Sequence, residues 1–69
     1  MDPVVLAKCW TFDDGTVCLL SKVNTSTWEL RVTRAPRLLR VELFGDIEVA
    51  LAAAKAWRAV FADAQARTG

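Results

Sequence analysis

The spacing of apolar residues changes abruptly at Gly45-Asp46. Before this point, residues 27–34 and 37–44 alternate apolar and polar side chains, a period of two that is typical of β-strands. After it, apolar residues recur every three or four positions toward residue 66, which is the period of an amphipathic helix. Asp46 is a suitable N-cap, because its carboxylate can accept hydrogen bonds from the free amides of a first helical turn. The sequence therefore predicts strands followed by one C-terminal helix that begins near Asp46.

Two more strands are predicted around Asp14-Gly15. Residues 4–12 and 16–23 are rich in β-branched, aromatic and small side chains, and the Asp-Gly pair can supply the positive φ of a two-residue hairpin turn. The 69 residues are too few for a second core. We expect one small α+β domain spanning residues 1–69. Its antiparallel β-sheet has three to four strands in the order β-β-β-β-α, with the amphipathic helix packed on one face.

The register of the second hairpin has two alternatives. If Arg34 pairs with Arg37 across the Ala35-Pro36 turn, Arg31 lies opposite Arg40. A shift by two residues sets Arg31 opposite Glu42 instead, which is electrostatically better. In either register the core face of this hairpin is predicted to carry the same apolar side chains: Trp28, Leu30, Val32, Leu39, Val41 and Leu43.

The first hairpin is apolar on both faces. A two-residue turn at Asp14-Gly15 places Trp10 and Leu19 on one face and a second apolar set on the other: Val5, Ala7, Cys9, Cys18 and Leu20. One helix, with its apolar arc centred near Trp57, covers only one face of a sheet, and a soluble monomer rarely leaves a large apolar patch exposed. We therefore predict that this second set is buried in a homodimer or against another protein partner.

Catalytic and metal chemistry find little support in the composition. The chain has no histidine, so the usual general base and imidazole ligands are missing. Two cysteines cannot build a tetrahedral zinc site alone, and Ser21 and Ser26 have no histidine to activate them. The Asp13-Asp14 pair suits a turn better than acid–base catalysis. We expect a protein that is not an enzyme and that binds no metal and no cofactor.

The N-terminal residues do not resemble a secretory signal, because Asp2 is acidic and Lys8 interrupts the short apolar run. No apolar stretch reaches the roughly 18 uncharged residues of a membrane span. We expect a cytoplasmic protein without membrane insertion. In that compartment Cys9 and Cys18 are expected to be buried, reduced thiols, and a disulfide between them is the alternative in some registers.

Four arginines recur at every third position of the second hairpin: Arg31, Arg34, Arg37 and Arg40. Gathered on one edge and outer face of the sheet, they could contact the phosphates and guanine edges of duplex DNA. Glu29 and Glu42 are expected on the same face, and the net charge is only +1, so a solvated face of mixed charge is the competing interpretation.

A family resemblance covers roughly residues 28–57. It rests on the runs Trp-Glu-Leu-Arg-Val at 28–32 and Arg-Val-Glu-Leu-Phe at 40–44, followed by Asp46, Glu48, Ala50 and Ala53. This pattern resembles the DNA-binding domain of plant ethylene-response factors and the arm-binding domain of phage integrases. The resemblance implies a three-stranded sheet backed by one helix that reads the major groove with its sheet, and it points to Arg31 and Arg40 as contacts. DNA binding is thus the alternative to the self-associating interaction module predicted above.

Overall fold

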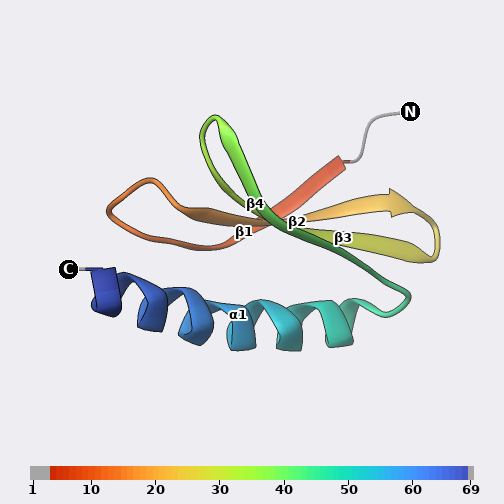
Figure 1. Ribbon diagram of the computed structural model, residues 1–69. Coiled ribbons are helices and arrows are strands. Elements are labelled where there is room, and N and C mark those ends of the chain that lie inside the picture. The colour runs from red at the N-terminus through yellow and green to blue at the C-terminus, as the bar shows by residue number, and fades with distance from the viewer. Residues whose placement is uncertain (1–3, 69) are drawn as a thin grey trace.

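The computed structural model describes residues 4–68 as a four-stranded antiparallel sheet followed by one helix (Figure 1). The strands are β1 (Val4–Thr11), β2 (Val17–Asn24), β3 (Thr27–Arg34) and β4 (Arg37–Phe44), and the helix is α1 (Ile47–Thr68). Neighbours in the sequence are neighbours in the sheet, in the order β1-β2-β3-β4. The predicted fold class is confirmed.

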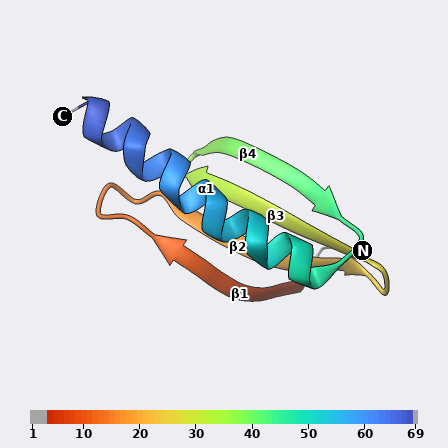
Figure 2. The same ribbon diagram turned by 90° about the horizontal axis from the view of Figure 1, so that it is seen from below.

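The helix and the sheet form two layers. Figure 2 shows α1 running obliquely beneath the sheet, with β1 on one side of it and β4 on the other. The hairpin of β3 and β4 rises away from the helix at its tip (Figure 1). One sheet face therefore packs on α1, and both edge strands keep one side without a neighbouring strand in the described part of the chain.

The core lies between the helix and one face of β1, β2 and β3. Leu30 and Val32 of β3 are fully buried. Alanines of α1 let the helix approach the sheet closely, and the indole N–H of Trp10 donates a 2.8 Å hydrogen bond to the carbonyl oxygen of Ala54. Val49 and Val60, which the helical spacing assigns to the apolar face of the helix, stay exposed, so the buried face is narrower than the sequence predicts. The buried apolar set is Trp10, Cys18, Leu20, Leu30, Val32, Ala50, Ala54 and Trp57.

The first helical turn confirms the predicted N-cap. The Asp46 carboxylate accepts a 2.8 Å hydrogen bond from the amide of Glu48, and the Asp46 carbonyl accepts the first helical bond, from Ala50, at 3.1 Å. A capped helix start directly after β4 sends the chain back beneath the sheet.

The turn of the first hairpin is one residue longer than predicted. The amide of Phe12 donates to the carbonyl of Thr16 at 2.8 Å, so three residues, Asp13, Asp14 and Gly15, form the loop. Gly15 takes a φ of 93°, the left-handed conformation that completes a three-residue hairpin loop. The sequence correctly predicts a turn at Asp14-Gly15, but the predicted loop length of two residues is wrong.

This extra loop residue reverses the predicted faces of β2. Trp10 lies opposite Cys18 instead of Leu19, and a slip of one residue turns every side chain of a strand to the other face. Cys18 and Leu20 are therefore buried beneath the helix, with 0% and 2% of their surface exposed. The prediction that they belong to an uncovered apolar face is wrong.

A second irregularity lies in β4. Thr33 pairs with Leu38, as the Arg34–Arg37 register requires, but Val32 then pairs with Arg40, so Leu39 is an extra residue. Arg31 consequently lies opposite Val41, which is neither of the two predicted registers. The shift turns Arg40 and Glu42 to the helix side and Val41 and Leu43 to the outer face. Of the three leucine and valine residues predicted for the core of this strand, Leu39 alone packs against it.

Candidate interaction surface

The sheet face opposite the helix is built from three rows of paired residues. Each row crosses all four strands. The row nearest the C-terminal end of β4 contains Val5, Ser21, Glu29 and Leu43. The middle row contains Lys8, Leu19, Arg31 and Val41, and the third contains Thr11, Val17, Thr33 and Leu38. The two inner strands contribute mostly polar side chains. The large apolar side chains of this face are thus concentrated toward its edges.

The centre of the outer face is sheltered and polar. Ser21 is only 5% exposed, and the side chain of Glu29 is 13% exposed and pairs with Arg31 at 3.1 Å. An ion pair with a half-exposed arginine contributes little stability, because solvent screens it. This region does not supply the apolar surface that a partner would cover.

The edge strand β4 carries the most extensive apolar surface of this face. Leu38, Val41 and Leu43 point outward and are 53%, 44% and 61% exposed. We call these three side chains the β4 strip. The alternation in the sequence places Val41 and Leu43 on one face of β4, as observed. It assigns that face to the core, however, because the bulge at Leu39 has no signal in the sequence.

The predicted partner surface does not form one patch. Val5 lies on the outer face, at the opposite edge from β4, and is 58% exposed. Ala7 is exposed but pairs with Leu20, on the helix side, and Cys9 is the extra residue at the register shift between Lys8 and Trp10. With Cys18 and Leu20 in the core, the five residues are divided among both faces and the interior.

Ala7 and Cys9 instead border a groove between β1 and the helix. The groove has a volume of about 290 Å³ and is lined by Ala7, Cys9, Trp10, Leu51, Ala54, Lys55 and Arg58. Its lining contains two cations and one thiol beside apolar side chains.

The two thiols are free and adjacent. Burial raises the pKa of the Cys9 thiol, and burial together with the neighbouring Cys9 raises the pKa of Cys18 to about 12. Both groups are therefore protonated near neutral pH, where only the thiolate is a good nucleophile. Cys18 is buried, as predicted, whereas Cys9 is only partly buried.

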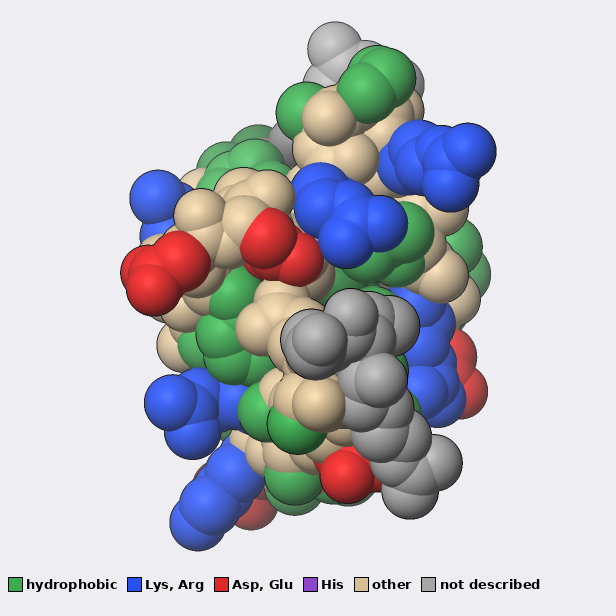
Figure 3. All heavy atoms as spheres, turned by 60° about the vertical axis from the view of Figure 1, so that its left-hand side comes forward, with side chains coloured by type: hydrophobic (Ala, Val, Ile, Leu, Met, Phe, Trp, Pro, Cys, Tyr) green, Lys and Arg blue, Asp and Glu red, His purple; other side chains and the backbone are tan. Residues whose placement is uncertain are grey.

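The four candidate DNA contacts are divided between the two sheet faces. Arg31 points outward, whereas Arg40 lies on the helix side, with its guanidinium carbon 4.1 Å from the centre of the Trp57 ring. Arg40 also pairs with Glu42 at 3.6 Å, and Arg34 pairs with Asp14 at 3.3 Å. Figure 3 shows basic side chains in separate groups, interrupted by acidic and hydrophobic ones, on the side of the molecule that it displays.

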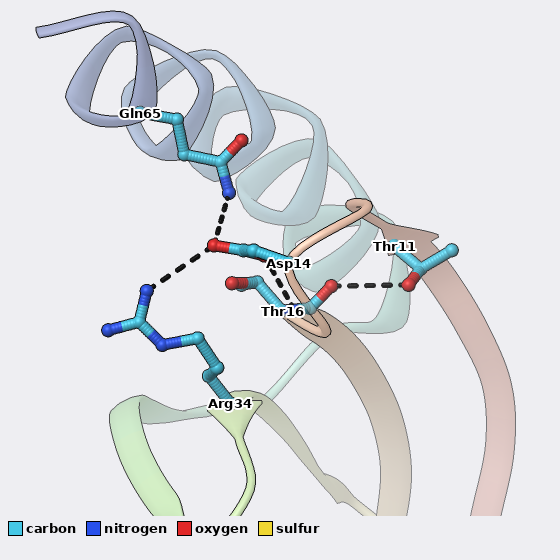
Figure 4. Close-up of polar contacts among 5 residues, drawn as sticks. All are labelled: Thr11, Asp14, Thr16, Arg34 and Gln65. Atoms are coloured by element: carbon cyan, nitrogen blue, oxygen red, sulfur yellow. Dashed lines mark hydrogen bonds and ion pairs between the residues drawn. The ribbon is translucent and has the colours of Figure 1, made fainter. Parts of the chain in front are cut away.

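Asp14 ties three elements together at one end of the molecule (Figure 4). One carboxylate oxygen accepts a 2.9 Å hydrogen bond from the amide of Thr16, and the other accepts from Gln65 of the helix at 2.8 Å and from Arg34 of β3 at 3.3 Å. The hydrogen bonds from Thr16, and then the neighbouring Arg34, hold the pKa of Asp14 below its ordinary value. A carboxylate engaged in this way serves as a structural tie.

A second groove lies beside this tie. It has a volume of about 300 Å³ and is lined by Asp14, Thr16, Arg34, Leu39, Phe61, Ala64 and Gln65. The charged groups that line it, Asp14 and Arg34, already pair with each other. The groove offers no unpaired charge toward which a charged ligand would be drawn.

In the described part of the chain, His, Cys, Asp and Glu side chains do not come together in any group of three or more that could hold a metal ion. Among residues 4–68, no helix combines the length and the apolar character that a membrane span requires.

Comparisons with known proteins return no relative. No protein-family model, no curated protein and no solved structure matches the chain.

Proposed function

We propose that the protein is a non-enzymatic interaction module that self-associates through the β4 strip. The observation that carries this proposal is the position of Leu38, Val41 and Leu43: three large aliphatic side chains, each 44–61% exposed, lie on an edge strand whose outer side is unpaired among the described residues. Exposed apolar edge strands are templates for pairing with another chain. Other copies of the chain are present in any solution of the protein, so we take a second copy as the partner.

The energetics favour a modest affinity. Complete burial of a leucine or valine side chain contributes about 1.5–3 kcal/mol relative to full exposure. Because the side chains of the β4 strip are already about half buried, association would gain roughly 1 kcal/mol for each of them. A dimer buries six such side chains, which together stabilise it by roughly 6 kcal/mol. This is near the lower end of the ~4–15 kcal/mol that association costs in lost translational and rotational freedom. Apolar contact alone therefore supports a weak dimer.

The absence of an enzymatic role is argued from the reactive groups. The chain has no histidine. Its two thiols are held in the protonated form, and the Asp14 carboxylate is engaged by three donors. Free thiols that lie side by side also suit a reducing compartment, so the expectation of a cytoplasmic protein stands as part of this proposal.

Sedimentation velocity over a range of micromolar concentrations tests the proposal. We expect the wild type to sediment as a dimer at the upper end of the range. Leu43→Lys places a charge in the β4 strip and is expected to give a monomer with an unchanged circular dichroism spectrum. Leu51→Lys is the matched control, because Leu51 is 47% exposed but lines the groove beside β1. A wild type that stays monomeric throughout, or equal behaviour of the two variants, contradicts the proposal.

DNA binding through Arg31, Arg34, Arg37 and Arg40 is the alternative function. The arrangement favours it less, because these side chains occupy both sheet faces and three of them pair with carboxylates. A salt titration of binding to duplex DNA distinguishes the two proposals. Several phosphate contacts would produce a steep loss of affinity with salt, whereas the interaction module is expected to show no binding at about 50 mM salt.

A further inference from the structure

β4 offers a second copy more than apolar side chains. It is an edge strand, and its ladder with β3 is regular from Arg40 to Phe44. Alternate backbone N–H and C=O groups of such a stretch point away from the sheet and can pair with a further strand. We propose that β4 pairs antiparallel with β4 of a second copy, centred on Val41, so that two sheets join into one. This inference rests on the proposed self-association and specifies its geometry.

The other edge is less suited to pairing. The β1 ladder with β2 shifts register twice, between Val5 and Ala7 and again between Lys8 and Trp10. Bulges bend a strand and leave residues unpaired, and natural sheets use them to protect edges. β4 has one shift, at Leu39, which precedes its regular stretch. The regular stretch of β4 thus runs over five consecutive residues, of which residues 40–42 of the two copies face one another in a pair centred on Val41, whereas the β1 ladder is interrupted twice.

The charges of β4 select the register. Directly opposite residues of an antiparallel pair share one face, so unlike charges there attract and like charges repel. Centring the pair on Arg40 opposes two arginines, and centring it on Glu42 opposes two glutamates. Centring it on Val41 places Arg40 of each copy opposite Glu42 of the other, twice in the symmetric dimer. Within each copy these side chains already lie on the same face, 3.6 Å apart, so the dimer would carry a two-by-two cluster in which each charge neighbours two opposite charges.

The same register joins the two β4 strips. Val41 of one copy lies opposite Val41 of the other on the outer face, and Leu43 of each copy faces the bulged Leu39 of the other, next to Leu38. Apolar side chains thus meet on one face while charges pair on the other. Backbone hydrogen bonds and two ion-pair contacts add to the apolar contact, which on its own supports only weak association.

A charge-swap experiment tests the register. A copy with Arg40→Glu has only acidic side chains at positions 40 and 42, and a copy with Glu42→Arg has only basic ones. Each variant alone should dimerise roughly tenfold or more weakly than the wild type, because both cross-strand pairs become repulsive. An equimolar mixture should recover dimers, since each repulsive pair becomes attractive. Sedimentation of the three samples measures this, and the mixed dimer is identified with one copy fluorescently labelled.

The outcomes separate this inference from the proposed function. If the wild type dimerises, the single variants dimerise equally well and the mixture shows no preference for mixed dimers, self-association stands and the β4–β4 register is wrong. If the wild type is a monomer at every concentration, both fall. Arg40→Glu also removes the contact with Trp57, so its fold is checked by near-ultraviolet circular dichroism.

A cross-linking measurement is independent of charge. In the proposed dimer, only a residue on the symmetry axis faces its own copy, at the Cα separation of about 4.5–5.5 Å that a disulfide tolerates. Val41→Cys treated with diamide should form a covalent dimer, whereas Leu43→Cys and the wild type should not. Equal cross-linking of Val41→Cys and Leu43→Cys, or of neither, would overturn the register even if Arg40→Glu failed to fold.

Discussion

At the scale of single residues, burial decides which chemistry the side chains can perform. Cys18 is fully buried beside Cys9, and its thiol packs like a small apolar group. Arg40 lies over the Trp57 ring, where a cation is attracted to the aromatic face, and its aliphatic stem covers apolar surface. By residue type alone, Cys18 could be a nucleophile and Arg40 a DNA contact. Their neighbours in the structure show that both side chains pack against apolar groups instead.

The raised pKa of the thiols predicts a pH dependence of stability. An unfolded cysteine ionises near 9.0, whereas Cys18 in the folded chain ionises at about 12. Below pH 9 both states are protonated, so the thiol has no effect; as the pH rises from 9 toward 12 the unfolded chain loses its proton first. The free energy of unfolding should therefore fall, by up to about 1.4 kcal/mol per pH unit.

Urea unfolding at pH 8 and pH 10, at one protein concentration, measures this effect. Cys18→Ala is the control, because it removes the titrating group, although it also weakens the core at both pH values. The loss of stability between the two pH values should be larger in the wild type than in the variant. An equal loss in both proteins would mean that Cys18 does not ionise abnormally.

At the scale of elements, the sequence predicts which segments are strands and where the helix begins, but it does not predict the register. The period of apolar residues and the turn residues mark all four strands, and Asp46 marks the helix start. Register depends on one-residue differences, at Asp13 in the first turn and at Leu39 in β4, which leave the periodic pattern almost unchanged. The predicted faces of β2 and β4 were reversed for this reason.

The same reversal explains why the candidate surface was misplaced. Exposed apolar side chains lie on both edge strands: Leu38, Val41 and Leu43 on β4, and Val4, Val5 and Leu6 on β1, whereas the predicted Cys18 and Leu20 are buried. Cys18 and Leu20 exchange places with Val17 and Leu19, and Leu43 and Val41 move from the predicted core to the outer face. Only three-dimensional pairing could show which apolar set the helix covers.

The helix start yields a prediction of its own. Asp46→Ala removes the carboxylate that accepts from the amide of Glu48, and the free energy of unfolding should fall by about 1 kcal/mol. Asp46→Asn is the matched variant, because asparagine caps a helix nearly as well as aspartate. Urea unfolding of the three proteins decides the matter, and equal destabilisation by both substitutions would argue against capping as the cause.

At the scale of the whole molecule, a single helix leaves half of the sheet surface open. The molecule measures 41 × 23 × 15 Å, so it is two layers thick, and its edge strands form much of its border. A chain of 69 residues buries only about 60% of the surface that it exposes when unfolded. Joining two sheets at β4 would enlarge the buried surface and turn two exposed edges into a shared interior.

Hydrogen exchange at the backbone of β4 tests this central claim most directly. In a monomer, the amides of Val41 and its neighbours that point away from β3 are open to solvent, whereas β4–β4 pairing would protect them. Exchange is followed residue by residue in dilute and in concentrated solutions. We predict that concentration slows exchange at the outward-pointing amides within residues 40–44 and leaves the amides of β1 unchanged. Exchange of β4 that is independent of concentration, or protection that appears at β1 or on the helix instead, would contradict it.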